Sequence, residues 1–158
     1  MRVGVGYDIH QFSDGRKLFI GGIEIPCPKG LKGHSDADVL IHALCDALLG
    51  ALGEQDIGHH FPNTDQKYKD ISSLKLLEEV RLLLEKKGYK IENIDTVVLM
   101  ESPNLGPYKE KIKERLAECL RIEKGRIGIK ATTHEGAGEI GRGEAAAAHA
   151  VVLIDSKN

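Results

Sequence analysis

The chain has 158 residues, of which 41% are hydrophobic and 29% charged, and its formal net charge is -2 at pH 7. This length suits a single domain with a sizeable core, and the balanced charge gives no sign of a nucleic-acid or acidic-membrane partner. Aromatic residues make up only 4% of the chain and Trp is absent, which argues against a base-stacking surface.

Residues 2–10 alternate in character, which predicts a β-strand. One side of this strand carries the apolar set Val3, Val5, Tyr7 and Ile9. The other side carries Gly4, Gly6, Asp8 and His10. A hairpin is expected over residues 18–25, where two short apolar runs flank a glycine pair, and residues 26–35 are expected to form a loop.

A long apolar helix is expected to start near Ser35, with Ser35-x-x-Asp38 as a variant of the capping box, and to stop at Gly53. Residues 54–70 look like a loop. A second helix is expected over residues 72–87, ended by Gly88.

The second half of the chain alternates strands and helices. Expected in order are a strand over 94–100, a loop over 103–107, a helix to about Leu120, a strand over 126–132 and a glycine-rich loop through Gly143. The tail is ambiguous, because residues 145–148 favour helix and residues 151–154 favour strand. Without repeats or linkers, we expect one α/β domain of the α+β type over residues 1–158, with a mixed sheet, helices on one face and ferredoxin-like character.

The three cysteines, Cys27, Cys45 and Cys119, are widely spaced and odd in number, which is a poor disulfide framework. We expect reduced thiols. No apolar run approaches the roughly 18 residues of a membrane helix, and the first residues do not resemble a signal peptide. A cytoplasmic location is therefore expected.

Asp8 and His10 are the first candidates for a metal site, because residues two apart on a strand point to the same face. Alone, such a pair is as consistent with an ion pair. His42 adds to it, since it lies in a helix that is otherwise apolar. Two histidines and one carboxylate with an open fourth position form a catalytic zinc pattern, although iron(II) oxygenases use the same ligand set.

Asp38 and Asp46 lie four residues either side of His42 and form one polar stripe with it on the expected helix. Two interpretations stay open. The stripe faces water, or His42 completes the metal triad while an aspartate orients its second ring nitrogen or binds elsewhere.

Two further segments suit phosphate chemistry. His34-Ser35-Asp36 lies at the expected start of the His42 helix, where free N–H groups favour an anion, although a simple helix cap explains it equally well. Thr132-Thr133-His134-Glu135 follows a strand, and its hydroxyls and carboxylate suit a divalent cation with phosphates, unless it is simply an exposed strand end. The run Gly136 to Gly141 spells a dinucleotide fingerprint, but the chain ends too soon for the unit that this fingerprint needs.

Together these segments resemble the 2-C-methyl-D-erythritol 2,4-cyclodiphosphate synthases of the non-mevalonate isoprenoid pathway, over nearly the whole chain. The stretches that carry the resemblance are Arg2 to His10, Gly33 to Asp38, His42 to Gly50, Asp56 to Gly58 with Phe61-Pro62, Lys130 to Glu135, and Gly141 to Glu144.

The resemblance implies zinc on Asp8, His10 and His42, and a second divalent cation, Mg²⁺ or Mn²⁺, near Glu135. It implies that His34 and Thr133 steady the transition state, with Asp38 and Asp46 as possible supports. It also implies a homotrimer with active sites between subunits. Implied substrate-binding positions are Asp8, His10, His34, Ser35, Asp56, Gly58, Phe61, Asn63, Asp65, Met100, Ser102, Asn104, Leu105, Gly106, Thr132, Thr133, Glu135, Glu139 and Arg142, those at 100–106 forming a cytidine pocket.

Three positions depart from the family pattern. Asn63 stands where many members have Asp, and Asn104-Leu105-Gly106 differs from the commonest cytidine loop. Glu139 stands where some members have a Phe on the trimer axis, which puts prenyl-diphosphate binding there in doubt, although Arg142 is kept.

The implied activity converts 4-diphosphocytidyl-2-C-methyl-D-erythritol 2-phosphate to the cyclic diphosphate with release of CMP. A zinc phosphohydrolase with the same triad is the nearest alternative, and a non-catalytic trimeric binding module is a more distant one.

Overall fold

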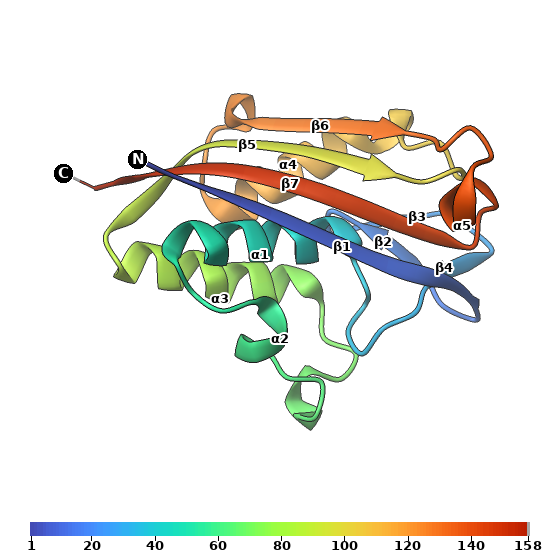
Figure 1. Cartoon of the computed structure of the whole chain (residues 1–158), viewed down its shortest axis with the longest axis horizontal. Coiled ribbons are helices and arrows are strands. Elements are labelled where there is room, and N and C mark those ends of the chain that lie inside the picture. The colour runs from blue at the N-terminus through green and yellow to red at the C-terminus, as the bar shows by residue number, and fades with distance from the viewer. Residues whose placement is uncertain (158) are drawn as a thin grey trace.

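A five-stranded sheet in the order β4-β1-β7-β5-β6 forms the centre of the fold, in a computed structural model that describes residues 1–157 (Figure 1). Neighbouring strands are antiparallel except for β5 and β6, which are parallel. The expected mixed sheet is thus confirmed. The strands are β1 (Arg2–Asp14), β4 (Lys29–Leu31), β5 (Tyr89–Leu99), β6 (Ile127–Thr132) and β7 (Ala145–Ser156).

Three long helices cover one face of this sheet: α1 (Val39–Leu52), α3 (Ser73–Lys86) and α4 (Lys109–Leu120) (Figure 1). The short helix α5 (Gly138–Gly141) instead packs its Ile140 against Ala145 and Ala147 at the start of β7. The remaining elements are the hairpin β2 (Leu18–Ile20) with β3 (Ile23–Ile25), the turn of helix α2 (Ile57–His60), and three 3-10 turns at Gln66–Tyr68, Gly106–Tyr108 and Lys124–Arg126. Within residues 1–157, no helix has the length and apolar character required to cross a bilayer.

The connections match the expected ferredoxin-like character only in part. β1 and β5 run parallel with the last strand, β7, inserted antiparallel between them, which is a split β-α-β unit. The chain order nevertheless differs from the β-α-β-β-α-β order of a ferredoxin-like domain, because β5, α4 and β6 form a second unit whose strands are direct neighbours.

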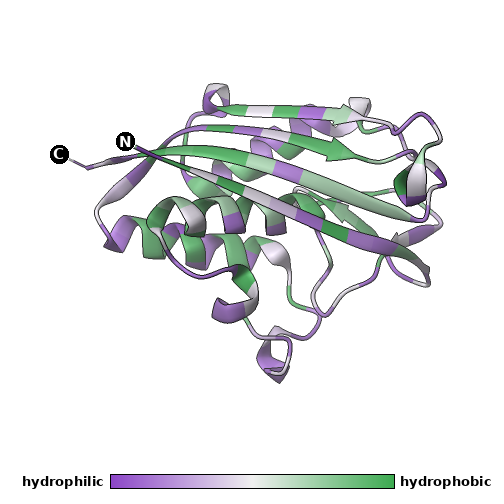
Figure 2. Ribbon diagram, in the orientation of Figure 1, coloured by the Kyte–Doolittle hydropathy of each residue, from purple (hydrophilic) through white to green (hydrophobic). Residues whose placement is uncertain are grey.

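Helix α1 lies unusually close to the sheet, because β1 turns glycines toward it. A Cβ added at Gly4 would lie 1.9 Å from the carbonyl oxygen of Ala47, and one added at Gly6 would lie 1.9 Å from that of Ala43. Only residues without side chains allow this approach. The helix is apolar on nearly every side (Figure 2) and forms the centre of the core between β1, β7 and α3.

The opposite face of the sheet exposes apolar side chains along β1 and β7. Val3 and Val5 are 68% and 69% exposed, and Tyr7, Ile9 and Val151 continue the same surface. The side assignment made from the β1 alternation is therefore confirmed. A contiguous apolar surface of this kind on a sheet marks an interaction site.

Two expected boundaries were wrong, and the tail, which the sequence left open between helix and strand, is decided by the structure. The loop expected over residues 26–35 contains β4. Helix α1 begins at Val39 rather than near Ser35, because Ala37 is left-handed, with φ 57°, and Asp38 caps the helix with its own side chain. The tail is strand throughout: Ala146 and Ala148 are fully buried toward α1, where larger side chains would not fit between closely packed elements. Packing thus overrode the helix propensity of the alanine run.

Candidate functional site

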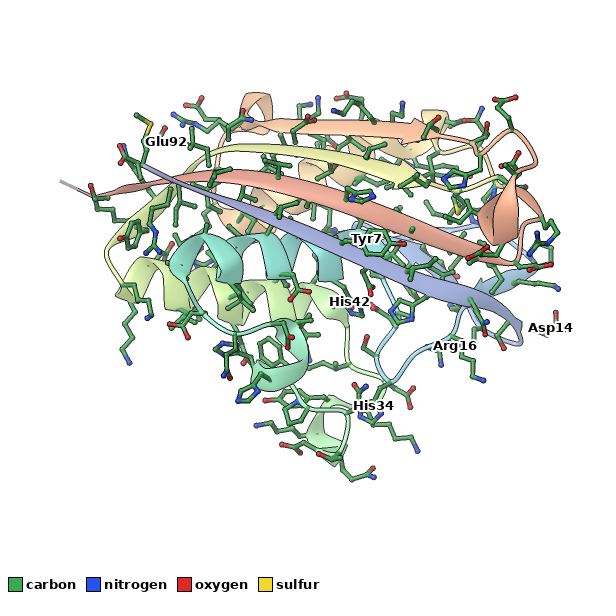
Figure 3. The ribbon with its side chains drawn as sticks, viewed as in Figure 1. Tyr7, Asp14, Arg16, His34, His42 and Glu92 are labelled. Carbon is green, nitrogen blue, oxygen red and sulfur yellow. The ribbon has the colours of Figure 1, made fainter. Side chains whose placement is uncertain are left out.

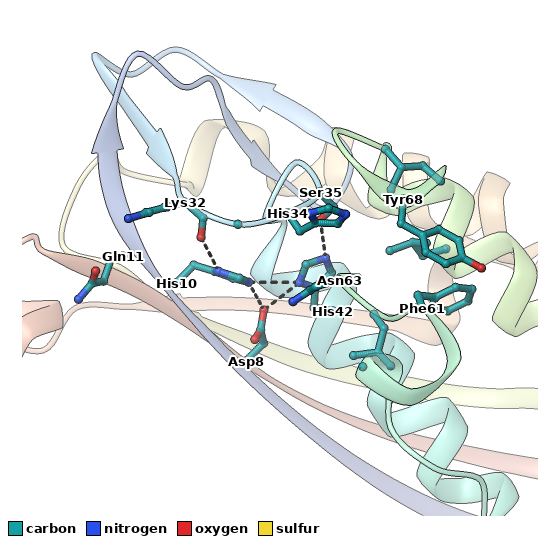
Figure 4. A pocket seen from close by; sticks show the side chains of 15 residues that line it. Asp8, His10, Gln11, Lys32, His34, Ser35, His42, Phe61, Asn63 and Tyr68 are labelled. Carbon is teal, nitrogen blue, oxygen red and sulfur yellow. Dashed lines mark hydrogen bonds and ion pairs between the residues drawn. The ribbon is translucent and has the colours of Figure 1, made fainter. Parts of the chain in front are cut away.

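Asp8, His10 and His42 bring three ligand atoms together where β1 passes over the second turn of α1 (Figure 4). The distance from Asp8 Oδ2 to His10 Nε2 is 3.0 Å and to His42 Nδ1 3.1 Å, and the two ring nitrogens are 3.3 Å apart. The sequence prediction that these three side chains meet is confirmed as geometry. Within residues 1–157 this is the one group of three or more such side chains close enough to hold a metal.

The triad fits a zinc ion in size. Zinc bonds to nitrogen and oxygen ligands are about 2.0–2.2 Å long, so the ligand atoms of a tetrahedral site lie roughly 3.3–3.5 Å apart. The three observed separations are close to these edges. His10 Nδ1 donates to the carbonyl oxygen of Lys32 at 2.7 Å, which places the proton of a neutral ring there and leaves Nε2 bare as a ligand.

Electrostatics keep the carboxylate ready to bind a cation. Burial alone would raise the pKa of Asp8, but without a metal the protonated rings of His10 and His42 donate hydrogen bonds to it and add positive charge, which lowers it to about 2. For His10, burial lowers the pKa, but the hydrogen bond and negative charge of Asp8 outweigh it and raise it overall. Asp8 is therefore ionised at neutral pH with or without a metal.

A cavity of about 460 Å³ opens beside the triad. His34 and Ser35 line it from the loop before α1, and Gly58, Phe61 and Asn63 line it from the segment around α2 (Figures 3 and 4). These five predicted substrate positions thus meet in one pocket. Asp56 and Asp65 border the same segment, where their side chains cap α2 and the turn at Gln66–Tyr68.

We expected free backbone N–H groups in the segment 34–36 to bind an anion, and this part of the expectation is wrong. The N–H groups of Asp36, Ala37 and Asp38 already donate to Ile71 O, Ser35 Oγ and Asp36 Oδ1. The loop satisfies its own donors because it folds back before the helix begins. The side chains of His34 and Ser35 still line the cavity.

Of the two interpretations left open for Asp38, His42 and Asp46, the structure contradicts a stripe facing water: His42 joins the triad, and both aspartates bind elsewhere. Asp38 is fully buried and accepts hydrogen bonds from the N–H groups of Gly21, Gly22 and Ile41, so it holds the β2–β3 turn and caps α1. Burial and the nearby charge of Asp36 raise its pKa, against those three donors. Asp46 accepts from the Ile57 N–H at 2.7 Å and ties α2 to α1. Neither carboxylate contacts His42.

A second pocket of about 390 Å³ lies at the far side of the sheet, between the ends of β5 and β6. Its walls include Met100, Asn104, Leu105, Thr132 and Thr133, all predicted substrate positions. Next to it, Thr133 Oγ1 donates to Glu135 Oε1 at 2.8 Å. Asn104 Oδ1 accepts from the Gly106 N–H and shapes the loop that also contains Ser102.

Glu139 and Arg142 lie outside both pockets, on and just after α5. Arg142 pairs with Glu144 at 2.9 Å on the exposed surface. Sequence reasoning had grouped these two residues with the substrate positions. In a single chain they are separate from the rest of the site.

The two pockets do not merge within one chain. Ile9 of β1 is paired with Ala147 of β7, which is paired with Leu99 of β5, which in turn is paired with Thr132 of β6. Three strand spacings therefore separate the metal triad from Thr132, roughly 14 Å at about 4.8 Å per spacing.

The family model described as the YgbB family matches residues 1–155 of the chain. The chain belongs to the YgbB family. Curated relatives named 2-C-methyl-D-erythritol 2,4-cyclodiphosphate synthase are similar over their full length. The one from Prosthecochloris aestuarii is 59% identical over 157 residues, covering 99% of this chain and 100% of its own. The one from Chloroherpeton thalassium is 57% identical over 155 residues, covering 98% and 99%. The resemblance read from the sequence is confirmed.

Solved structures of YgbB-type proteins share the fold. A 2C-methyl-D-erythritol-2,4-cyclodiphosphate synthase described as a bound form with CDP superposes with a TM-score of 0.90 at 38% identity, covering 98% of this chain and 100% of that one. The Plasmodium falciparum IspF CDP complex gives 0.87 at 35% identity, covering 99% and 97%. The bifunctional IspDF of Campylobacter jejuni gives 0.94 at 40% identity over 98% of this chain, which spans only 42% of that longer chain.

Sequence reasoning missed several residues around the triad. Ser73 lies 2.9 Å from His42 Nε2, and Lys32 binds His10 through its backbone carbonyl. Tyr68 closes the cavity against Phe61, with ring centroids 5.3 Å apart. A serine at a helix start and a backbone oxygen in a loop give no signal in one sequence, and only their position in the fold identifies them.

Proposed function

We propose that the chain is a 2-C-methyl-D-erythritol 2,4-cyclodiphosphate synthase, which converts 4-diphosphocytidyl-2-C-methyl-D-erythritol 2-phosphate to the 2,4-cyclodiphosphate and releases CMP. The observation that carries the proposal is the meeting of Asp8, His10 and His42 at tetrahedral spacing beside a cavity, in a full-length YgbB chain.

In the proposed reaction, an oxygen of the 2-phosphate attacks the β-phosphorus. The new P–O bond closes the ring as the bond from the β-phosphorus to the bridging oxygen breaks, and CMP leaves with that oxygen. A phosphate monoester is largely dianionic at neutral pH, because its second pKa is about 6, so the nucleophile needs no dedicated base. The enzyme has to orient two negatively charged ends and absorb charge on the phosphoryl oxygens.

The residues of the chain divide this work between the two pockets. Asp8, His10 and His42 are proposed to hold Zn²⁺, which when bound acts as a Lewis acid and template toward phosphate oxygens. His34 and Ser35 are placed to donate hydrogen bonds into the same cavity. Phe61 and Asn63 line the side on which the methylerythritol part is proposed to lie.

On the other side, the backbone and side chains of residues 100–106 are proposed to bind cytidine, in keeping with the CDP complexes of the structural relatives. Thr132 and Thr133 are proposed to donate to the diphosphate. Glu135 is proposed to hold a second divalent cation, Mg²⁺ or Mn²⁺, whose preference for oxygen ligands suits a carboxylate beside phosphates. Glu139 and Arg142 remain proposed ligand contacts at a subunit junction.

The proposed active unit is a homotrimer. The two groups of site residues form separate pockets three strand spacings apart in one chain, and an apolar sheet face is left uncovered along β1 and β7. Packing this face against neighbouring copies would bury Val3, Val5 and Tyr7 and bring the nucleotide pocket of one chain to the metal cavity of another. A cytoplasmic location is proposed alongside, because Cys27, Cys45 and Cys119 are free thiols.

The direct test is phosphorus NMR of a reaction with the cytidyl substrate, Zn²⁺ and Mg²⁺. A cyclic diphosphate with stoichiometric CMP is expected. Formation of an opened phosphate instead would replace the proposal by a zinc phosphohydrolase, and no product from a zinc-loaded sample would refute both.

A further inference from the structure

His42 has a second ring nitrogen, Nε2, which points away from the triad and into a closed group of hydroxyls. It lies 2.9 Å from Ser73 Oγ and 3.1 Å from Ser35 Oγ. Ser73 is fully buried at the first position of α3, and Ser35 is 7% exposed. The direction of these hydrogen bonds decides which nitrogen of a neutral His42 carries the proton.

The carboxylate of Asp36 settles that direction. Ser73 Oγ donates to Asp36 Oδ1 in a short hydrogen bond, because an ionised carboxylate only accepts. The single proton of the Ser73 hydroxyl is thereby used, so its oxygen is left to accept from His42. His42 then carries its proton on Nε2 and presents Nδ1 bare toward Asp8 and His10.

Asp36 is itself held in place from several sides. Its Oδ2 accepts from the Ser73 N–H at 3.0 Å, which is one of the donors that a helix start leaves without a partner. Its position at the N-terminus of the 14-residue helix α3 favours a negative charge there. Its own N–H donates to Ile71 O. The carboxylate therefore joins the loop before α1 to the first turn of α3.

We propose that Asp36 and Ser73 are positioning residues for His42: the Asp36 carboxylate fixes the Ser73 hydroxyl, whose oxygen accepts the Nε2–H of His42 and leaves Nδ1 as the ligand nitrogen. The arrangement is a carboxylate–serine–histidine series that ends at the proposed metal. Asp36 and Ser73 thus orient the second ring nitrogen of His42, a role that the sequence had suggested for Asp38 or Asp46. This inference rests on the metal site proposed above.

The test measures Zn²⁺ affinity of the purified protein by competition with a chromophoric chelator. Removing a partner that orients a metal-bound histidine costs about 10–100-fold in affinity. We expect Ser73→Ala and Asp36→Ala each to bind Zn²⁺ about tenfold more weakly. Because Asp36 acts through Ser73, the double variant is expected to be no weaker than the weaker single variant.

Two matched controls accompany the series. Ser72→Ala changes the adjacent exposed serine, whose side chain makes no capping hydrogen bond, and Asp70→Asn removes the charge of an exposed aspartate of the same connection while keeping a residue that tolerates its positive φ. Both are expected to keep wild-type affinity. In zinc-loaded protein, proton–nitrogen NMR is expected to show the Nε2 proton of His42 exchanging faster with water in Ser73→Ala than in the wild type.

Unchanged affinity in Ser73→Ala, or a double variant whose loss is the product of the two single losses, overturns the inference. If Asp36→Ala does not fold, Ser73→Ala compared with Ser72→Ala decides alone. A wild-type protein that fails to bind Zn²⁺ would instead refute the proposed metal site together with this inference, so the two failures are distinguishable.

Discussion

The metal cavity and the nucleotide-side pocket are built in different ways. At the metal cavity, Asp8, His10 and His42 come from strand β1 and the core helix α1. The second ring nitrogens of both histidines are hydrogen-bonded to residues of the same chain. At the nucleotide-side pocket, Thr132, Thr133 and Glu135 lie at a strand end and on an exposed turn, and the residues bond mainly to one another. The first region has its contacts within a single chain, and the second is the one that we propose a neighbouring chain completes.

Because of this difference, we expect some variants to lose turnover while they keep their metal affinity. A change in the metal cavity removes both, while a change on the open sheet face or at the nucleotide side removes turnover and leaves the metal. The predictions below test that separation, beginning with the largest expected effect.

His42→Ala is expected to abolish both metal retention and CMP release, because it removes one of three ligands and leaves too few for a tetrahedral site. Metal content of the purified protein and turnover on the cytidyl substrate are the measurements. His60→Ala, which changes a histidine on α2 paired with Glu54, serves as the control and should retain the metal. A metal-free His42→Ala protein with full activity would contradict the assignment.

Val5→Glu is expected to prevent assembly, because it puts a charge in the middle of the uncovered apolar face. We expect monomers by analytical ultracentrifugation, a loss of turnover of at least about 100-fold, corresponding to about 2.7 kcal/mol in transition-state stabilisation, and unchanged Zn²⁺ affinity. Leu82→Glu is the matched control, since Leu82 is 50% exposed on α3, away from this face. An active monomer would disprove the proposal that neighbouring chains complete the site.

Glu135→Gln and Thr133→Ala are expected to lower kcat by about 10–1000-fold, the range seen when one charge-stabilising group is removed from an active site. Zn²⁺ affinity at the triad should not change, because these residues lie three strands away. Raising the Mg²⁺ concentration should partly restore Glu135→Gln and not Thr133→Ala. Equal rescue of both would argue against a cation at Glu135.

Asp38→Asn is expected to affect stability rather than chemistry. An amide turns an N–H₂ group toward one of the three backbone donors that the carboxylate now satisfies, which costs about 1–3 kcal/mol of unfolding free energy. Denaturant unfolding measures this loss, and folded protein should keep its Zn²⁺ affinity within a few-fold. A large fall in metal affinity without a fall in stability would contradict this structural role and indicate that Asp38 supports the metal site.

The sequence predicted the parts of the molecule that depend on local periodicity. The β1 alternation predicted that Asp8 and His10 share one side of the strand, and the apolar surroundings of His42 made it a candidate to join them. The family resemblance then implied that all three residues hold one metal ion. Gly53 and Gly88 were likewise identified as helix ends, and both adopt positive φ.

What the sequence could not supply depends on contacts between distant segments. Asp38 looked like a partner of His42 from helical spacing, but its partners lie in the β2–β3 turn, 16 and 17 residues earlier. Ser73 reaches His42 across 31 residues, and no pattern around it indicates this. The alanines at 145–148 became strand because β1 pairs with all four, and β5 pairs with Ala147 and Ala148 on the other side.

The glycines of β1 set the distance between α1 and the sheet. They thereby determine how far His42 lies from Asp8 and His10, although they bind none of the three. Gly6 lies two positions before Asp8, and any methyl group there would meet the α1 backbone at 1.9 Å. Lifting the helix by even a fraction of that clash would spread the nitrogen of His42 from the two β1 ligands. Substitutions are therefore expected to impair the site even at positions with no reactive group, because the lack of a side chain at these glycines fixes the distance between strand and helix.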